Sequence, residues 1–404
     1  MIKRGGYGNK IFYRLGFWPV LPKKKPQKKR IWIQAVSVGE LSSIQFVLKS
    51  FLADTNIEIV LSGTTSTGQK IAEQKYSKQV LACGPFPLDW FPFSKLAWSR
   101  IKPDMAITID SELWPEHIHQ AKLNGIPFFT INARLSDRSF SRLKALKIFK
   151  KLLFPDNLTI CASSGKQKSR WQEVGIPSNR VHDLGNLKID ISPITPTSLD
   201  KRKARKKDLG FSASSIVITG ISTWPGEEKM LLEILQEMRS LNFDARLLII
   251  PRHAERKNDI LEIIKSYPFS YQQRSQQKKT KLENIVYLGD TTGELTQLIE
   301  AGDIAFLGKT LPPRREGQNP IEPVAMGLPL VLGPQCSNFQ EICDELLACG
   351  AALQGMSANE IKKIFHDLFK NSEKAKEMSR AGIEWRNTQG SPSTKTVQTL
   401  QKFL

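Results

Sequence analysis

The chain has 404 residues, of which 40% are hydrophobic and 24% charged, so it is long enough for two domains with large buried cores. This composition is typical of a folded globular protein and excludes a disordered one. The formal net charge of +20 indicates an anionic partner, which is nucleic acid, an anionic membrane or a phosphorylated substrate.

Basic and aromatic residues are mixed through residues 1–30, which contain ten lysines and arginines and no acidic residue. The apolar and aromatic residues of this segment include Tyr7, Ile11, Phe12, Tyr13, Leu15, Phe17, Trp18, Val20 and Leu21. Such a mixture is typical of a segment in an anionic membrane interface, so we expect residues 1–30 to face a membrane surface. An equally good interpretation is that the rings pack on the following domain while the lysines stay in solvent.

No apolar run approaches the roughly 20 residues that a membrane-spanning helix needs. Arg14 and Pro19 interrupt the short N-terminal apolar stretch that a secretory signal would use. We therefore expect a protein that stays in the cytosol or on the membrane face toward it. The five cysteines include no C-x-x-C pair, so we expect reduced, mostly buried thiols and no metal site.

Short β-rich runs alternate with helical stretches, a pattern that predicts an α/β fold with parallel, doubly wound sheets. The first series of expected strands covers residues 31–36, 57–61, 105–109, 128–131 and 158–162. The second series covers residues 216–219, 246–250, 285–288, 304–307 and 328–332, with helices between them such as 227–241 and 293–301. We therefore expect two Rossmann-like domains that bind ligands at the carboxyl ends of their strands.

The composition between and after the two series predicts the domain boundaries. Residues 191–207 are rich in proline, serine, threonine and charge, as interdomain linkers are. We therefore expect a first domain at 31–190, a linker at 191–207 and a second domain at 208–371. Residues 372–404 are expected to form helices that pack back on the first domain.

Three candidate catalytic side chains lie in the first domain, Glu40 and Glu112 directly after expected strands and Lys188 near the end of the domain. Glu40 ends the stretch SVGE, Glu112 lies in DSELWP, and Lys188 ends GNLK. A carboxylate near a helix start can accept a proton from a substrate, and a lysine can neutralise phosphate as a point charge. Each also fits an ordinary helix-start acid or a solvated lysine, so the spacing alone leaves both interpretations open.

Four loops of the second domain also follow expected strands. Their candidate ligand-binding residues are Ser222 and Thr223; Pro251 and Arg252; Thr292, Gly293 and Glu294; and Asn319, Pro320, Ile321 and Glu322. Hydroxyls and free backbone N–H groups at a helix start suit a phosphate, and a carboxylate can bridge ribose hydroxyls. Ordinary caps and turns are the alternative for each loop, and no Walker A loop or G-x-G-x-x-G fingerprint occurs.

The order and spacing of these motifs resemble the 3-deoxy-D-manno-octulosonic acid (Kdo) transferases from about residue 31 to residue 339. The matching stretches are SVGE, SELWP, INARLS, GNLK, PRHAER, DTTGEL and NPIEP. The resemblance implies a GT-B glycosyltransferase fold, with two Rossmann-like domains facing a cleft. It also implies an inverting transfer of Kdo from CMP-Kdo to a lipid A precursor (lipid IVA), no metal or other cofactor, and a peripheral location on the cytoplasmic face of the bacterial inner membrane.

The resemblance also implies a role for each candidate residue. Glu40 resembles the general base, and Glu112 and Lys188 resemble groups that stabilise the transition state. The candidates of the second domain resemble contacts to CMP-Kdo, with Pro251 and Arg252 in a motif that binds the cytidine nucleotide.

Several positions depart from the pattern usual in this family. Trp224 replaces a histidine, Lys309 replaces the second residue of a Gly-Gly pair, and Asp110 replaces the first glutamate of E-x-E-L-W-P. The stretch Glu316–Asn319 reads EGQN where GGHN is usual. These positions lie near the expected donor phosphate, so the departures leave the details of the phosphate contact open, while the base and the nucleotide motifs remain.

Two other functions fit the same sequence features. One is a GT-B enzyme that uses another nucleotide sugar, and the other, in a different class, is a basic nucleic-acid-binding protein. The second domain has no recognised RNA- or DNA-binding motif, and the lysine runs lie in the expected linker and N-terminal segment. We therefore expect no nucleic-acid partner.

Overall fold

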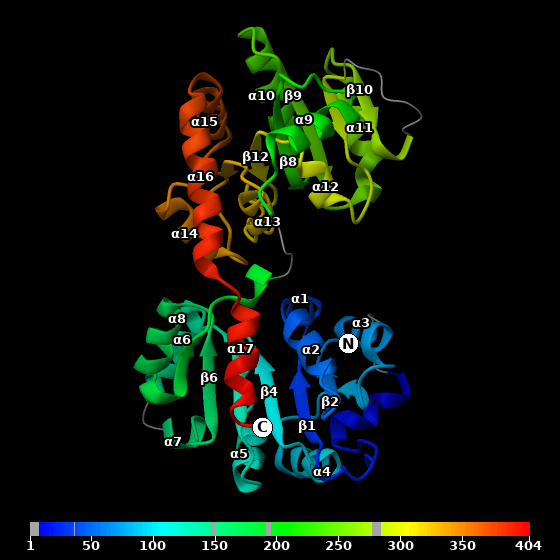
Figure 1. The fold of residues 1–404 in the computed structure, drawn as a ribbon, viewed down its shortest axis with the longest axis vertical. Helices are drawn as coiled ribbons and strands as arrows, with labels where there is room; N and C mark the ends of the chain where they lie inside the picture. Colours follow the sequence, from blue (N-terminus) through cyan, green and yellow to red (C-terminus); the bar gives the residue numbers. More distant parts are fainter. Residues whose placement is uncertain (1–7, 36, 147–149, 191–194, 277–283) are drawn as a thin grey trace. The chain divides into compact units, whose positions relative to one another are not determined.

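A computed structural model describes residues 8–35, 37–146, 150–190, 195–276 and 284–404 and divides the chain into two compact units (Figure 1). Unit 1 consists of Met1–Ile191 and Ser391–Leu404, and unit 2 consists of Ser192–Gly390. Each unit contains a seven-stranded sheet in which every described strand pairing is parallel, and helices alternate with the strands. The predicted fold class, a GT-B chain of two Rossmann-like domains, is confirmed.

The sheet of unit 1 has the strand order β3-β2-β1-β4-β5-β6-β7. Its strands are β1 (Lys29–Gln34), β2 (Ile57–Gly63), β3 (Ala82–Pro85), β4 (Met105–Ile109), β5 (Phe128–Ala133), β6 (Leu158–Ala162) and β7 (Val181–Asp183). Its helices are η2 (Gly8–Leu15), α1 (Val38–Ser43), α2 (Gln45–Leu52), α3 (Ser66–Tyr76), α4 (Phe91–Ile101), α5 (Pro115–Leu123), α6 (Asp137–Ala145), α7 (Lys150–Leu153), α8 (Gly165–Glu173), η4 (Ser178–Arg180), η5 (Leu187–Asp190) and α17 (Pro392–Gln401). The strand order reverses between β1 and β4, which is where ligands bind in such sheets.

Both faces of this sheet are buried, as a parallel sheet requires. Successive residues of β1 point to opposite faces, so Ile31 and Ile33 join one apolar cluster whereas Trp32 joins the other. This explains why the central strands are almost continuously apolar and were visible in the sequence.

The sheet of unit 2 has the strand order β10-β11-β9-β8-β12-β13-β14, which reverses between β8 and β12. Its strands are β8 (Ile216–Thr223), β9 (Ala245–Pro251), β10 (Tyr271–Gln273), β11 (Val286–Leu288), β12 (Ile304–Leu307), β13 (Leu330–Leu332) and β14 (Ala352–Gln354). Its helices are α9 (Leu199–Asp208), α10 (Glu227–Ser240), η6 (Ala254–Arg256), α11 (Lys257–Lys265), η7 (Arg274–Gln276), α12 (Leu295–Ile299), α13 (Ile321–Ala325), α14 (Gln340–Ala348), α15 (Ala358–Lys370) and α16 (Ser372–Gln389).

The structure corrects the predicted linker at 191–207. Ser198 caps the helix α9, and Arg205 and Lys206 form ion pairs with Glu300 (3.0 Å) and Asp303 (2.7 Å) of unit 2. These contacts make α9 a part of unit 2, so its charged composition reflects a solvated helix face with buried ion pairs. Residues 191–194 lie outside the described residues.

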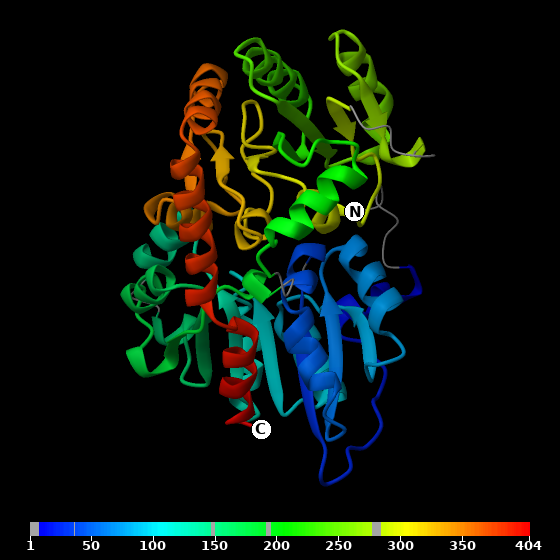
Figure 2. The same cartoon turned by 45° about the horizontal axis from the view of Figure 1, so that its top comes forward.

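The predicted C-terminal helical segment divides between the two units. The long helix α16 belongs to unit 2, whereas α17 (red in Figure 2) belongs to unit 1 and packs against α2 and η5. The backbone N–H of Ser393 donates to Asp190 Oδ2 (2.6 Å), which fastens the start of α17 to η5. Among the helices of the described residues, none has the length and apolar character that crossing a bilayer requires.

Candidate functional site

The three candidate catalytic residues of unit 1 lie at the carboxyl end of its sheet. Glu40 follows β1, Glu112 follows β4, and Lys188 lies in η5 after β7. Glu40 and Glu112 therefore flank the point between β1 and β4 at which the strand order reverses.

Glu40 lies in the first turn of α1 and takes part in its capping. Its backbone N–H donates to Ser37 Oγ (3.3 Å), and the Ser37 hydroxyl donates to Glu40 Oε1 (3.1 Å). The side chain is half-buried. The capping and catalytic interpretations are compatible, because the helix N-terminus stabilises the anionic form that a general base needs.

Asp110 is the centre of a polar network that connects these residues. Its carboxylate accepts hydrogen bonds from Asn132 Nδ2 (2.6 Å) and Arg134 Nη2 (2.8 Å). Asn132 Oδ1 in turn accepts from the backbone N–H of Leu187 (2.9 Å), which attaches η5 to the end of β5. Asp110 and Asn132 both have left-handed backbone conformations, with φ of 59° and 52°.

The charged groups of this network influence the pKa values of Lys188 and Glu112. Burial lowers the pKa of Lys188 and the Arg134 guanidinium lowers it further, whereas Asp110 and Glu40 act in the opposite direction. Burial raises the pKa of Glu112, and the Asp110 carboxylate adds to the rise. The structure therefore brings all three predicted residues into one electrostatically coupled group. Asn132 and Arg134 were not assigned a role from the sequence, although both lie in the INARLS motif.

In unit 2, a buried carboxylate accepts hydrogen bonds from backbone amides near the point between β8 and β12 at which the strand order reverses. Glu227 of α10 is 3% exposed and accepts from the backbone N–H groups of Trp224 (2.8 Å), Lys309 (3.0 Å) and Thr310 (3.2 Å). Burial raises its pKa to about 7. Of the N–H groups expected beside Ser222 and Thr223, that of Trp224 already donates to Glu227 and is therefore not open to a phosphate.

Some predicted donor-binding residues are buried and others are accessible. Thr223, Pro251, Pro320 and Ile321 are buried, so they position the loops around them. Ser222 is partly exposed, and Arg252, Thr292 and Gly293 are exposed. The backbone N–H of Arg252 donates to the Thr223 carbonyl (3.2 Å), and its side chain has no hydrogen bond or ion pair with any described residue.

The carboxylate of Glu294 is held by an arginine of unit 2. Arg274 donates to Glu294 from Nη2 (2.7 Å) and Nε (3.2 Å), and the Thr291 hydroxyl donates to Oε2 (2.5 Å). The Arg274 hydrogen bond is the main reason why the pKa of Glu294 falls to about 2. Glu294 thus anchors the loop that exposes Thr292 and Gly293.

Glu322 keeps a carboxylate oxygen available. Asn319 Oδ1 accepts from the backbone N–H of Ile321 (3.0 Å), and Asn319 Nδ2 donates to Glu322 Oε1 (3.4 Å). Within the described part of the chain Glu322 Oε2 has no hydrogen bond, and burial raises the pKa of this carboxyl. This arrangement suits the predicted contact to ribose hydroxyls, since a carboxylate can accept two hydrogen bonds.

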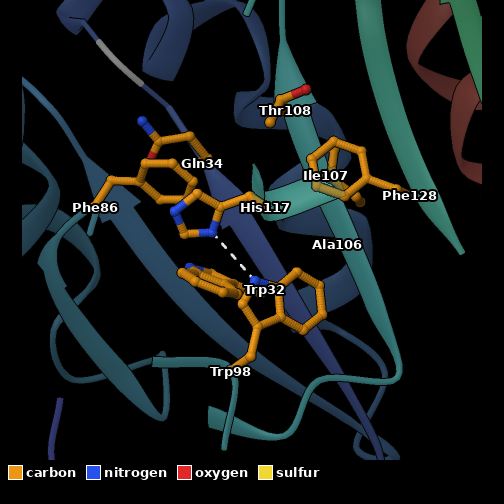
Figure 3. A pocket seen from close by; sticks show the side chains of 9 residues that line it. All are labelled: Trp32, Gln34, Phe86, Trp98, Ala106, Ile107, Thr108, His117 and Phe128. Atoms are coloured by element: carbon orange, nitrogen blue, oxygen red, sulfur yellow. Dashed lines mark hydrogen bonds between the residues drawn. The ribbon is translucent and has the colours of Figure 1, made fainter. Parts of the chain in front are cut away.

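The cavity in Figure 3 lies in the core of unit 1 and contains none of the predicted site residues. The Trp98 indole N–H donates to His117 Nδ1 (3.1 Å), and aromatic rings such as Trp32 and Phe86 surround the imidazole. Burial lowers the pKa of His117 to about 3, so the imidazole is neutral near pH 7. In the described residues, no group of three or more histidine, cysteine, aspartate or glutamate side chains is placed to hold a metal ion.

Comparisons with known proteins agree with these motifs. The sequence model of a family described as 3-deoxy-D-manno-octulosonic-acid transferase (kdotransferase) matches residues 9–191. The chain is 29% identical over 386 residues to a 3-deoxy-D-manno-octulosonic acid transferase of Haemophilus influenzae, covering 95% of this chain and 88% of that relative. It is 27% identical over 366 residues to a transferase of the same name from Chlamydia pneumoniae, covering 90% and 82%.

A solved structure shares the fold. UDP-GlcNAc 2-epimerase from Neisseria meningitidis, bound to UDP-GlcNAc, aligns with a TM-score of 0.59 and 16% identity, covering 92% of this chain and 100% of that chain. This likeness concerns the architecture of two Rossmann-like domains alone.

Proposed function

The chain belongs to the 3-deoxy-D-manno-octulosonic acid (Kdo) transferase family and is a glycosyltransferase, and on this premise we propose that it moves Kdo from CMP-Kdo to a lipid A precursor such as lipid IVA. The observation that carries the proposal is the coupled group of Glu40, Glu112 and Lys188 where the strand order of unit 1 reverses. Its members are a carboxylate at a helix start, a second carboxyl and a partly buried lysine.

The proposed reaction is a single displacement with inversion at the anomeric carbon. A hydroxyl of the acceptor attacks that carbon, the new C–O bond forms as the bond to the phosphate oxygen breaks, and CMP leaves. Glu40 accepts the proton of the hydroxyl, which raises the nucleophilicity of the oxygen. Lys188 and Glu112 stabilise the charge that redistributes in the transition state.

Unit 2 is proposed to bind the donor. Arg252, Thr292, Gly293 and the open carboxylate oxygen of Glu322 are available to the nucleotide, while buried neighbours hold their loops. The leaving group is one phosphate monoester, whose charge side-chain cations can neutralise. We therefore propose that the transfer needs no metal ion or other cofactor.

The proposed location is the cytoplasmic face of the bacterial inner membrane, where the protein binds peripherally. Phe12 and Phe17 are 60% and 49% exposed, and Trp90 and Phe91 at the start of α4 are 64% and 53% exposed. The helix η2, which contains Phe12, packs against α4, which begins at Phe91. A hollow beside Val20 is lined by basic residues including Lys23, Lys24, Arg100 and Lys102, which suit anionic headgroups.

The test is an assay of the full chain with CMP-Kdo and lipid IVA, with the product mass and anomeric configuration read directly. We expect a mass gain of one or more Kdo residues, inverted configuration, and unchanged turnover in the presence of a chelator. Transfer from another nucleotide sugar, and none from CMP-Kdo, would favour the other GT-B interpretation. Loss of turnover with the chelator would contradict only the metal-free mechanism.

A further inference from the structure

Three residues that depart from the family pattern contact one another in unit 2. The Lys309 ammonium lies 4.5 Å from the centroid of the Trp224 ring, and Lys309 Nζ lies 3.5 Å from Glu316 Oε1. The Arg314 guanidinium carbon is 4.8 Å from the same ring centroid. His253, which follows Arg252, meets the indole at 86° with its centroid 5.2 Å away. Two cations are therefore held on one aromatic ring.

Two hydrogen bonds hold the backbone of Lys309. Its N–H donates to Glu227 (3.0 Å), and its carbonyl accepts from the N–H of Gly317 (2.9 Å). Its φ of 63° is left-handed, a conformation that glycine adopts without strain and lysine does not. The chain thus tolerates local strain at the position where it has a cationic side chain instead of the usual glycine.

This cluster lies where the strand order of unit 2 reverses. Trp224 follows β8 and Lys309 follows β12, and these neighbouring strands end at the same edge of the sheet. The amides of Trp224, Lys309 and Thr310 are occupied by Glu227, so an anion at this edge needs other donors. The side chains of Lys309 and Arg314 supply them.

We propose that Lys309 and Arg314, held against Trp224, bind the phosphate of the nucleotide donor; this inference rests on the proposed function. A guanidinium or ammonium on an aromatic face keeps outward N–H groups that can donate to phosphate oxygens. Arg314 is exposed and has no acidic partner among the residues that the structure describes. Lys309 has only the longer contact to Glu316, which the phosphate of a bound nucleotide can outcompete.

The experiment compares CMP with cytidine, which differ by the phosphate alone. Calorimetry on the full chain is expected to show about tenfold or greater loss of CMP affinity in Arg314→Gln and in Lys309→Met, with cytidine affinity unchanged. Arg315→Gln is the matched control, because Arg315 is an exposed neighbour in the same loop without contact to the indole. It removes the same charge and is expected to keep CMP affinity.

The variant Lys309→Gly distinguishes a loss of CMP binding from a loss of folding. Glycine relieves the strain at positive φ, so this variant should unfold at the same temperature as wild type or higher while losing CMP affinity. Trp224→Leu, which changes no charge, should also weaken CMP binding more than cytidine binding.

The possible failures are distinguishable. Unchanged CMP affinity in Arg314→Gln and Lys309→Gly overturns the inference, as does an equal loss for CMP and cytidine. A loss in Arg315→Gln as large as in Arg314→Gln also overturns it, because the effect then reflects general charge. A wild-type protein that binds neither CMP nor cytidine overturns the proposed donor, and with it this inference.

Discussion

Asp110 interacts with residues at the ends of three different strands and in this way connects the candidate catalytic residues. It holds Asn132 and Arg134, influences both Lys188 and Glu112, and adopts a left-handed backbone conformation itself. The aspartate fits a position at which its carboxylate bonds side chains from the next strand, and aspartate tolerates positive φ better than most residues.

Glu40→Gln should lower turnover by about 10²–10⁴-fold, because the amide cannot accept the hydroxyl proton. Donor affinity and thermal stability should be unchanged, since glutamine can still make the capping hydrogen bonds with Ser37. Steady-state kinetics and calorimetry measure the two effects. Ser37→Ala is the control, as it should cost about 1 kcal/mol of stability without a comparable loss of turnover. Near wild-type turnover in Glu40→Gln would exclude Glu40 as the base.

Lys188→Met should lower kcat more than it lowers CMP affinity, because the lysine charge matters most as the phosphate leaves. Lys188→Arg keeps the charge and should retain more activity than the methionine variant. Burial and Arg134 lower the pKa of Lys188, so the lysine loses its charge at a lower pH than an ordinary lysine does. Wild-type activity should therefore fall at a correspondingly lower pH as the pH rises. Parallel losses of kcat and CMP affinity would instead make Lys188 a ground-state donor ligand.

Arg252→Ala and Glu322→Ala should each weaken CMP binding. Arg252 is an exposed cation without a partner among the described residues, and Glu322 has an open carboxylate oxygen at the same edge of the sheet of unit 2. We expect a loss of about tenfold for each, measured by calorimetry. Glu255→Ala, an exposed acid of the same loop as Arg252, is a control that should bind CMP normally. Unchanged affinity in both test variants would remove the nucleotide assignment.

Among the elements, the four strands that the sequence analysis missed are the four edges of the two sheets. They are β3 and β7 in unit 1 and β10 and β14 in unit 2, each of three or four residues. An edge strand pairs on one side only, so a short and less apolar segment suffices. The central strands, buried on both faces, need continuous apolar residues and were therefore recognisable.

His117 makes the packing of α5 on the sheet sensitive to acid. Its pKa falls to about 3 when buried, against about 6.5 in the unfolded chain. The folded state therefore binds fewer protons between these values, so its stability is complete above pH 6.5 and falls on acidification by up to about 1.4 kcal/mol per pH unit. Denaturant unfolding at pH 7 and pH 5 should show a larger loss for wild type than for His117→Gln. Equal losses would contradict this prediction.

For the molecule as a whole, the packing interpretation of the N-terminal segment holds for Trp18 and Tyr13, and the membrane interpretation stays a prediction for the exposed rings. Trp18 is fully buried and lies 5.1 Å from Tyr13 and 6.2 Å from Trp32 between ring centroids. Phe12, Phe17 and Val20, by contrast, are exposed. The expected contribution of Tyr7 lies outside the described residues.

The double variant Phe12→Ser/Phe17→Ser should reduce binding to anionic vesicles, and high salt should reduce wild-type binding further, because basic residues add a screened attraction. Sedimentation with vesicles containing anionic lipid measures both effects. Point variants are preferable to deleting residues 1–30, since deletion removes buried Trp18 and Arg30. Leu123→Ser, at an exposed leucine elsewhere on unit 1, is the matched control. Equal binding of the double variant and wild type would contradict membrane docking through these side chains.

The sequence by itself determined the parallel two-domain architecture, the central strands and the loops that carry Glu40, Glu112 and the donor motifs, whereas Lys188 follows the edge strand β7, which was not recognised. These are local properties, since an apolar run reports burial on both faces and a polar motif after it lies at a strand's carboxyl end. Only the tertiary structure decided which groups share contacts. Glu227 meets amides more than 80 positions away, and Lys309 and Arg314 meet Trp224 from a distant loop. Such contacts depend on two strands becoming neighbours, which no local pattern records.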